Sequence, residues 1–541
     1  MSPRFSVVTP VYDPPVDVLR ATIRSVTEQT FTDWQLVLVD DLSPTSAVLE
    51  TLDEAAAADP RITVVRRATN GGIVAASNDA LAAATGEFVA LLDHDDELHP
   101  DALRLVDEAL RARPEADYAY TDEDKIDEHG RRTGPFYKPD WSPERLRTQM
   151  YTCHLSVLRR SLVEEVGGFD ADFEGSQDWD LVLRVTERAR EVVHVPHVLY
   201  HWRLLATSTA AGGEAAKPYA YEAGTRALQA HCERIGLPAT VERDLEFGGV
   251  YHLHPVLTEQ PSVSIVIPTN GGTREVRGEV IPLVVHCVRS IVETSTYANY
   301  DITVVADAST PQATLEQVGS IAGDRLTIVP YRHPFNFSDK INMGALASEG
   351  EHLLMLNDDM EVVTPGWLER LVMYSAFPGI GAVGAKLLFG DGRLQHVGVM
   401  MRGASPGHLF RGFGTDFSGY ANVVRVANNY SAVTGACLMT PRATFDEVGG
   451  LSLQFPLSFN DVDYCLKVQT LDQRVVYDPD TVLYHFESSS RSSRVDDWEL
   501  DLFQQRWRHV TMLDRYDNPN FHPSSVHMVP PVYHADGEVL V

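Results

Sequence analysis

The sequence predicts two tandem α/β domains, each built around a mostly parallel β-sheet. Three observations lead to this fold class. The chain has 541 residues, which is more than one hydrophobic core usually organises. Short aliphatic runs alternate with amphipathic stretches, and this alternation is typical of a parallel sheet covered by helices. The same succession of segments then begins again in the second half, which indicates a duplicated domain.

The first half opens with the elements of such a sheet. Residues 5–9 form an apolar run, and a proline-rich turn separates them from a helical pattern at residues 16–30. Residues 35–39 are almost continuously aliphatic, as expected of a strand buried on both faces. The further elements expected are, in order, a helix, a strand at 62–65, a loop at 70–72, a helix at 77–84 and a strand at 87–92. This βαβαβαβ order predicts a parallel sheet.

The second half repeats these segments in the same order. The repeated pairs are SVVTP (6–10) with SIVIP (264–268), LVLVDDLS (36–43) with ITVVADAS (302–309), and QDWDLVLR (177–184) with NDVDYCLK (460–467). Periodicity is lost at HLHPVLTEQPS, near residues 255–262, where two prolines occur. We therefore expect an N-terminal domain at residues 1–257 and a C-terminal domain, with a C-terminal extension, at residues 258–541.

The composition limits the classes of partner and the cellular location. The formal net charge of −31 disfavours nucleic acid and an anionic membrane surface as partners, because like charges repel at long range. Five cysteines without a CxxC pair predict neither a disulfide framework nor a zinc site. No segment approaches the about 18 apolar residues of a membrane span, and the first residues lack a signal-peptide pattern. We expect a cytoplasmic protein with at most peripheral contact to the inner face of the plasma membrane.

Polar residues follow three of the predicted strands. Ligands of an open parallel sheet bind beyond the carboxyl ends of its strands. The segments in this position are Thr9-Pro10-Val11-Tyr12, Asp40-Asp41 and Asp93-His94-Asp95-Asp96. Loop polarity or helix capping explains any one of them, but explains all three less well. Asp93 and Asp95 lie one residue apart, so both can reach one Mg²⁺ or Mn²⁺ ion, which can hold a diphosphate.

Both halves resemble the glycosyltransferases of family 2, which have the Rossmann-like GT-A fold. The first half does so over nearly all of residues 4–210, through SVVTPVYDPP, SVTEQTF, LVLVDDLSP, NGGIVAASNDAL, TGEFVALLDHDDELHPDAL and GSQDWDLVLR. The second half does so over about residues 262–490, through SIVIPTN, VVADAS, LMLNDDMEV, GAVGAKLL, TGACLMTP, FNDVDYCLKV and YHFESSSR. The pattern of the second half is similar to domains that transfer rhamnose, galactofuranose or similar sugars in bacterial surface-polysaccharide and O-antigen pathways.

The resemblance implies where the first half would bind the nucleoside of a nucleotide sugar. Thr9 and Tyr12 would line the nucleoside. Asp41, with Asp40 beside it, would contact the pyrimidine base.

The resemblance also implies the metal motif and the catalytic base of the first half. Asp93 and Asp95 would form the DXD metal motif, with Asp95 as the more direct ligand. Asp178 would be the general base, although the family usually has Glu-Asp where this chain has Gln177-Asp178. His201 would complete the metal shell, but a hydrogen-bonded histidine at a strand end explains it equally well.

An equivalent site is implied in the second half. Its residues would be Pro268 and Asp307 at the nucleotide, Asp358, Asp359 and His485 at the metal, and Asp461 as the base. Asn270 and Ala306 stand where the first half has Tyr12 and Asp40, which leaves base stacking and the choice of nucleotide open.

These observations lead to one main hypothesis. It is a bifunctional inverting glycosyltransferase, dependent on Mg²⁺ or Mn²⁺, that moves hexosyl or deoxyhexosyl units from UDP-, dTDP- or GDP-sugars to a glycan or lipid-linked acceptor. Such a transfer needs a base for the acceptor hydroxyl and a cation for the departing diphosphate. The alternative keeps one catalytic domain and makes the other a platform that binds the acceptor or a partner.

Two other classes fit less well. A sugar nucleotidyltransferase would need a glycine-rich, basic loop near the N-terminus, and TPVYDPP contains no glycine, lysine or arginine. A non-enzymatic scaffold leaves two sets of strand-end carboxylates without a purpose.

Overall fold

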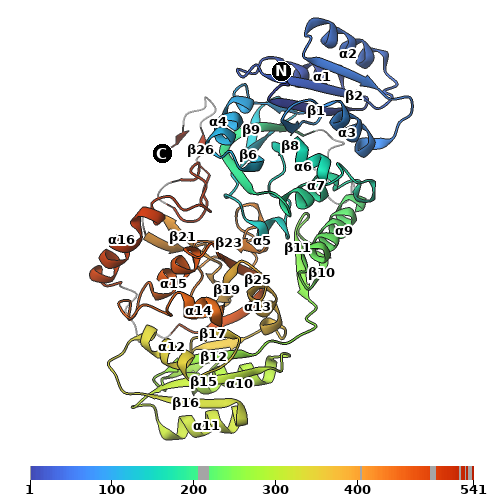
Figure 1. Cartoon of the computed structure of the whole chain (residues 1–541). Helices are drawn as coiled ribbons and strands as arrows, with labels where there is room; N and C mark the ends of the chain where they lie inside the picture. The colour runs from blue at the N-terminus through green and yellow to red at the C-terminus, as the bar shows by residue number, and fades with distance from the viewer. Residues whose placement is uncertain are drawn as a thin grey trace.

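The computed structural model describes residues 2–204, 218–402, 405–487, 495–522 and 525–530, and the backbone of two short strands, β26 (Val532–Tyr533) and β27 (Val539–Leu540). Two large sheets follow one another along an elongated molecule (Figure 1). The first sheet contains strands from β1 to β9 and the second contains strands from β12 to β25. The α/β class and the tandem arrangement predicted from the sequence are therefore confirmed.

The first sheet has the strand order β3-β2-β1-β4-β8-β6-β9-β5, with β7 paired to β6. Its strands are β1 (Phe5–Val11), β2 (Trp34–Asp40), β3 (Ile62–Arg66), β4 (Phe88–Leu91), β5 (Glu97–Leu98), β6 (Ala116–Ile126), β7 (Arg132–Phe136), β8 (Ser156–Arg159) and β9 (Glu191–Arg203). The half from β3 to β4 is parallel and contains the strands that the aliphatic runs predict. β8 then enters antiparallel to both β4 and β6, so the complete sheet is mixed.

Helices cover both faces of the parallel half. The helices of this part of the chain are α1 (Val16–Thr27), α2 (Ser46–Ala58), α3 (Gly72–Ala83), α4 (Ala102–Ala112), α5 (Pro143–Leu146), α6 (Arg160–Glu165) and α7 (Gln177–Thr186). Because successive strand residues point to opposite faces, Val7 packs in the core with α1 and α4, whereas Val8 packs with α3. The sheet is thereby fixed as a rigid support for the loops at its carboxyl edge.

The second sheet repeats the strand order of the first and adds one strand, β23. Its order is β16-β15-β12-β17-β24-β19-β25-β18, with β20 paired to β19 and β23 paired to β25. Its strands are β12 (Val263–Thr269), β15 (Tyr300–Asp307), β16 (Leu326–Tyr331), β17 (His352–Leu356), β18 (Met360–Val362), β19 (Ile380–Leu388), β20 (Leu394–His396), β23 (Asn428–Asn429), β24 (Cys437–Pro441) and β25 (Arg474–His485). The duplication thus extends into the antiparallel half, where the sequence pattern is weaker.

The second half differs from the first mainly by two added hairpins. Its helices are α10 (Leu283–Thr294), α11 (Gln312–Ala322), α12 (Phe337–Leu346), α13 (Trp367–Ser375), α14 (Arg442–Glu447), α15 (Asn460–Gln469) and α16 (Asp497–Thr511). One hairpin, β13 (Thr273–Val276) and β14 (Glu279–Pro282), follows β12. The other, β21 (Val399–Arg402) and β22 (Ser405–His408), follows β20, at the place where the first half has α5.

A helix and a hairpin join the two sheets. α9 (Pro218–Ile235) is followed by β10 (Ala239–Arg243) and β11 (Tyr251–Pro255), and residues 256–262 lead from there into β12. Leu228 packs in a core with residues of the first half, whereas Cys232 and Leu253 pack in the core of the second sheet. The connection between the two sheets is therefore packed against both halves of the chain.

The two halves also share buried polar contacts. The carboxylate of Glu144, which is fully buried, pairs with Arg147 at 2.8 Å and with Arg474 of β25 at 2.9 Å. Burial raises the pKa of Glu144, but the two guanidinium groups outweigh burial and lower it to about 2. Asn518, from the segment after α16, donates to Asp122 at 2.8 Å and to the carbonyl oxygen of Lys138 at 2.9 Å.

In the described ranges, no helix combines the length and apolar character that crossing a membrane requires.

Candidate functional site

A cavity of about 70 Å³ lies at the carboxyl ends of β1 and β4 in the first domain. Asp93, just after β4, and Asp178, in the first turn of α7, both line it. Pro10 of β1 and Tyr200 of β9 close other sides. The structure therefore brings together one predicted metal residue and the predicted base, which lie far apart in the sequence.

The carboxylates at this cavity repel one another. Burial raises the pKa of Asp93, and the charges of Asp95 and Asp178 raise it further, while His154 opposes the rise. Carboxylate oxygens that lie close together in a buried site are suitable ligands for Mg²⁺ or Mn²⁺, because a divalent cation offsets the repulsion between them. The donor set of Asp93 and Asp95 therefore fits such an ion.

A tyrosine fixes the loop that carries these carboxylates. Tyr200 donates from its hydroxyl to Asp96 at 2.5 Å and accepts from the backbone N–H of Asp93 at 3.3 Å. The backbone N–H of Arg203 donates to the other oxygen of Asp96 at 2.7 Å. Burial raises the pKa of Asp96 well above its ordinary value, so Asp96 is a structural group of this loop.

His154 and Glu123 form a part of this site that the sequence reasoning missed. His154 lines the cavity and stacks on Tyr200, with ring centroids 4.6 Å apart. Burial lowers the pKa of His154, but Cys153 and Glu123 raise it more strongly, to well above the ordinary value. His154 therefore supplies positive charge beside the carboxylates. No sequence motif joins it to Glu123, which lies on β6.

The group formed by Glu123, Cys153 and His154 has ligand atoms close enough together to hold a metal ion. A buried ammonium group already lies there. Lys138 Nζ is 2.9 Å from Glu123 and donates to the carbonyl oxygens of Cys153, at 3.1 Å, and His154, at 2.6 Å. This lysine takes the place that a cation would need, so the group does not fit a second metal.

The predicted nucleoside residues of the first half lie along the same edge. Asp41 caps α3, because the backbone N–H groups of Gly71 and Gly72 each donate to it at 2.9 Å. It also pairs with Arg67 at 2.5 Å. Tyr12 is 52% exposed and therefore free to cover a ligand.

Two further residues of this edge are buried. Asp40 accepts from the backbone N–H of Ser43 at 3.1 Å. The hydroxyl of Thr9 is buried and has no hydrogen-bond partner among the described residues.

His201 does not line the cavity of the first domain. Its Nδ1 atom lies 2.6 Å from Asp124 of β6. The neighbouring Tyr200 points toward Asp93, and alternation along β9 directs His201 to the opposite face. The structure thus gives His201 a hydrogen-bonded position at a strand end, and its role as a metal ligand stays a prediction.

The equivalent histidine of the second domain does reach the metal motif. His485 Nε2 lies 3.0 Å from Asp359. Burial lowers the pKa of His485, but Asp359 raises it more, so the net shift is upward. A carboxylate and an imidazole at this distance are a donor pair that Mn²⁺ accepts.

A difference in strand register accompanies this contrast. Glu97 of β5 lies opposite His201 of β9, whereas the equivalent Glu361 of β18 lies opposite Tyr484 of β25. The pairing is therefore shifted by one residue between the domains, and such a shift reverses which side chains share a face.

The remaining predicted residues of the second domain form a connected row. Lys340 Nζ lies 2.7 Å from Asp307 and donates to the carbonyl oxygen of Thr269 at 3.2 Å. The hydroxyl of Thr269 donates to Asp358 at 2.5 Å. Pro268 is buried in β12 beside them.

Asp461, in the first turn of α15, is held by the loop before β24. Its Oδ2 atom accepts from the backbone N–H of Gly435 at 2.9 Å. A Cβ atom at position 435 would lie 3.2 Å from the Cβ of Asp461, so a glycine is needed for this approach.

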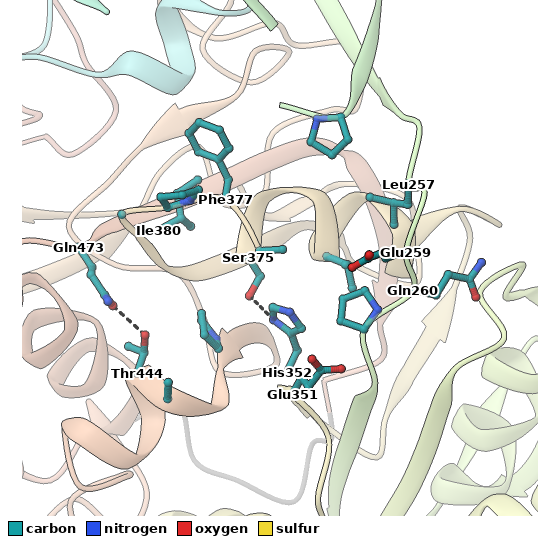
Figure 2. A pocket seen from close by; sticks show the side chains of 18 of the residues that line it. Leu257, Glu259, Gln260, Glu351, His352, Ser375, Phe377, Ile380, Thr444 and Gln473 are labelled. Atoms are coloured by element: carbon teal, nitrogen blue, oxygen red, sulfur yellow. Dashed lines mark hydrogen bonds between the residues drawn. The ribbon is translucent and has the colours of Figure 1, made fainter. Parts of the chain in front are cut away.

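A larger cavity, of about 740 Å³, lies elsewhere (Figure 2). It lies between the linker at residues 257–261, the start of β17 and the end of α13. His352 and Ser375 hydrogen-bond there at 2.8 Å. This cavity is at the amino end of the parallel strands and contains none of the predicted site residues, so it is not the candidate site.

Comparisons with known proteins agree on one family. The model of Glycosyl transferase family 2 matches residues 6–167 and 264–445. The uncharacterized protein y4gI of Sinorhizobium fredii is 40% identical over 96% of this chain and 57% of its own length. The O-antigen biosynthesis protein RfbC of Myxococcus xanthus is 37% identical over 90% of this chain and 38% of its own length. The chain therefore spans between about two fifths and three fifths of these relatives.

Solved structures match less closely. The structure of S. aureus TarS 1–349 in complex with UDP-GlcNAc is 20% identical, with a TM-score of 0.36, over 42% of this chain and 66% of that chain.

Proposed function

The chain belongs to glycosyl transferase family 2, and we propose that each of its two domains transfers one sugar from a nucleotide-sugar donor in surface-polysaccharide biosynthesis. The observation that carries this proposal is the cavity that Asp93 and Asp178 line together at the carboxyl ends of β1 and β4. A base and a diphosphate site must lie on opposite sides of the anomeric carbon in an inverting transfer.

In the first domain, Asp178 accepts the proton of the acceptor hydroxyl. Asp93 and Asp95 would hold Mg²⁺ or Mn²⁺, which neutralises the diphosphate of the donor when bound. His154, charged through Glu123, adds a second positive group near the leaving phosphate. Thr9, Tyr12, Asp40 and Asp41 line the nucleoside.

In the second domain, Asp461 accepts the acceptor proton. Asp358, Asp359 and His485 would hold the cation, while Pro268 and Asp307 lie along the nucleotide. The exchange of Tyr12 and Asp40 for Asn270 and Ala306 supports a different donor in this domain. We propose UDP-, dTDP- or GDP-sugars carrying hexosyl or deoxyhexosyl groups as the donors, and a glycan or lipid-linked chain as the acceptor.

Donor hydrolysis tests the proposal. Purified protein is incubated with a panel of UDP-, dTDP- and GDP-sugars in Mg²⁺ or Mn²⁺, and the released nucleoside diphosphate is measured. We expect release from one donor or two, and loss of release in EDTA. The matched control is the double variant Asp95→Ala with Asp359→Ala. We expect this variant to release no nucleoside diphosphate even with Mg²⁺ or Mn²⁺ present. Release that persists undiminished in EDTA, or in this variant, would contradict the proposed metal-dependent transfer.

A further inference from the structure

The second domain contains a pair of histidines, one on β20 and the other on the added hairpin that follows it. His396 ends β20 and His408 ends β22 of the added hairpin. Their Nδ1 atoms are 3.0 Å apart, and the rings meet nearly edge to face at 80°. His396 is buried, while His408 is partly exposed.

The hydrogen-bond partners fix which nitrogen carries the proton in each ring. The backbone N–H of Thr434, which can only donate, points to His396 Nε2 at 3.3 Å. His396 therefore carries its proton on Nδ1 and donates it to His408 Nδ1. His408 must then carry its own proton on Nε2. Burial lowers the pKa of both rings, which favours these neutral forms.

The same loop holds this pair and the proposed base. Thr434 donates to His396, and the next residue, Gly435, donates to Asp461. Asp461 is also the charged group that acts most strongly on His408, raising its pKa against the effect of burial. Two consecutive backbone amides thus set the position of the histidine pair relative to the carboxylate.

The Nε2–H group of His408 is available to a ligand. Within the described ranges, this atom makes no hydrogen bond to another residue. The other charged groups that act on His408 are Arg411, Glu487 and His485. Arg411 forms an ion pair with Glu487 at 2.8 Å, and this carboxylate largely neutralises its charge. A neutral N–H group among carboxylates suits a sugar hydroxyl better than a phosphate, which prefers charged donors.

We propose that His408 binds the acceptor sugar of the second domain, by donating from Nε2 to a hydroxyl next to the one that Asp461 deprotonates. His396 is a positioning residue that sets the tautomer of His408. This inference rests on the proposed function of the second domain and deepens it. In the described part of the first domain, α5 stands where the second domain has this hairpin, and no equivalent of His408 is present there.

The kinetic test uses the full chain with Asp178→Asn, so that only the second site transfers sugar. The acceptors are a panel of p-nitrophenyl glycosides, and the donor is whichever nucleotide sugar supports transfer. His408→Ala should raise the acceptor KM about 10-fold, since one hydrogen bond to the acceptor is lost. His408→Gln, which keeps an N–H near the Nε2 position, should restore most of the loss, and the donor KM should change much less. His129→Ala, an exposed histidine, is the matched control.

The outcomes separate this inference from the proposed function. Absence of any transfer in the Asp178→Asn background would overturn the function of the second domain itself. Transfer with an acceptor KM equal in His408→Ala and the background would overturn only the role of His408. Thermal unfolding of each variant shows whether a loss of transfer comes from misfolding. If His408→Ala is misfolded, the acceptor KM of His408→Gln tests the role of His408 instead.

A second readout needs no substrate. Long-range ¹H–¹⁵N spectra of ¹⁵N-histidine-labelled protein distinguish the two neutral tautomers, and His396→Asn and His408→Gln assign the signals. We expect the Nδ1–H form for His396 and the Nε2–H form for His408. An Nε2–H form of His396 would contradict the inferred direction of donation.

Discussion

The two domains have the same strand order but surround their carboxylates differently. In the first domain, the side chains of Lys138 and His154 supply positive charge, and both interact with Glu123 of β6. In the second, His485 contacts the metal motif directly and an added hairpin brings His408 toward the base. A sheet edge therefore fixes where the carboxylates lie, while insertions and strand register decide which groups face them.

The largest expected effect concerns the two bases. Asp178→Asn and Asp461→Asn should each lower one transfer by about 10²–10⁴-fold, because each removes a general base. Mass spectrometry of products from a defined acceptor, with both donors present, should show two different stalled intermediates. Asp172→Asn, at an exposed position in the short helical turn before α7, serves as the control. An intact product ladder with Asp461→Asn would make the second domain a binding platform.

Metal dependence sharpens the comparison of the two histidines. EDTA should stop transfer at both sites, and Mg²⁺ or Mn²⁺ should restore it. His485→Ala should raise the metal concentration needed by the second site about 10–100-fold. His201→Ala should have a smaller effect on the first site, because its imidazole is hydrogen-bonded to Asp124. Titration of activity with Mn²⁺ measures both. Equal shifts would mean that the two histidines have the same role.

The contact between the domains should respond to pH. The pKa of Glu144 is lowered from 4.5 to about 2 in the folded protein, so its ionised form stabilises the fold above the unfolded pKa. This contribution, about 3 kcal/mol, should be lost as pH falls from about 5 toward 2. Chemical denaturation of Glu144→Gln should therefore show a weaker pH dependence in this range. An unchanged pH dependence would show that the ion pair with Arg474 does not stabilise the folded protein.

The smallest expected effect concerns the segment after α16. Asn518→Ala leaves Asp122 and the carbonyl group of Lys138 with one partner fewer, which should cost about 1–3 kcal/mol of unfolding free energy. Asn299→Ala, which removes an exposed hydrogen bond to Gln260, should cost much less. Urea denaturation measures both. Equal losses would mean that the buried contact adds nothing to the association of the domains.

The sequence predicts the parallel half of each sheet well, because buried parallel strands have continuous aliphatic residues. The antiparallel half is harder to predict. β6 has the sequence ADYAYTDEDKI, whose acidic run is typical of a loop, yet all but one of its residues are buried. Its carboxylates are paired across the fold, for example Glu123 with Lys138 and Asp124 with His201. Such pairing depends on tertiary structure and has no local pattern.

The candidate site shows the same division. Asp93 could be identified because it follows a buried strand, and Asp178 because GSQDWDLVLR resembles a motif of family 2 glycosyltransferases. The sequence predicts a loop at residues 70–72, but α3 already begins at Gly72. Asp41 accepts a hydrogen bond from the backbone N–H of Gly72 at this start of the helix. The hydrogen bond between His396 and His408 could not be predicted, because it joins β20 and β22, which belong to different sheets and whose contact no motif specifies.

The contact of Asn518 with Lys138 has a consequence for the order of folding during synthesis. The two residues are separated by 380 positions, and ribosomes add about 5–20 residues per second. Asp122 and Lys138 therefore wait roughly 20–80 s for this partner after they leave the ribosome. During that interval Asp122 has its partners within the first domain, the backbone N–H of Lys138 and His194, but lacks the hydrogen bond from Asn518. The last packing step of the first domain can thus occur only when nearly all of the second has been made.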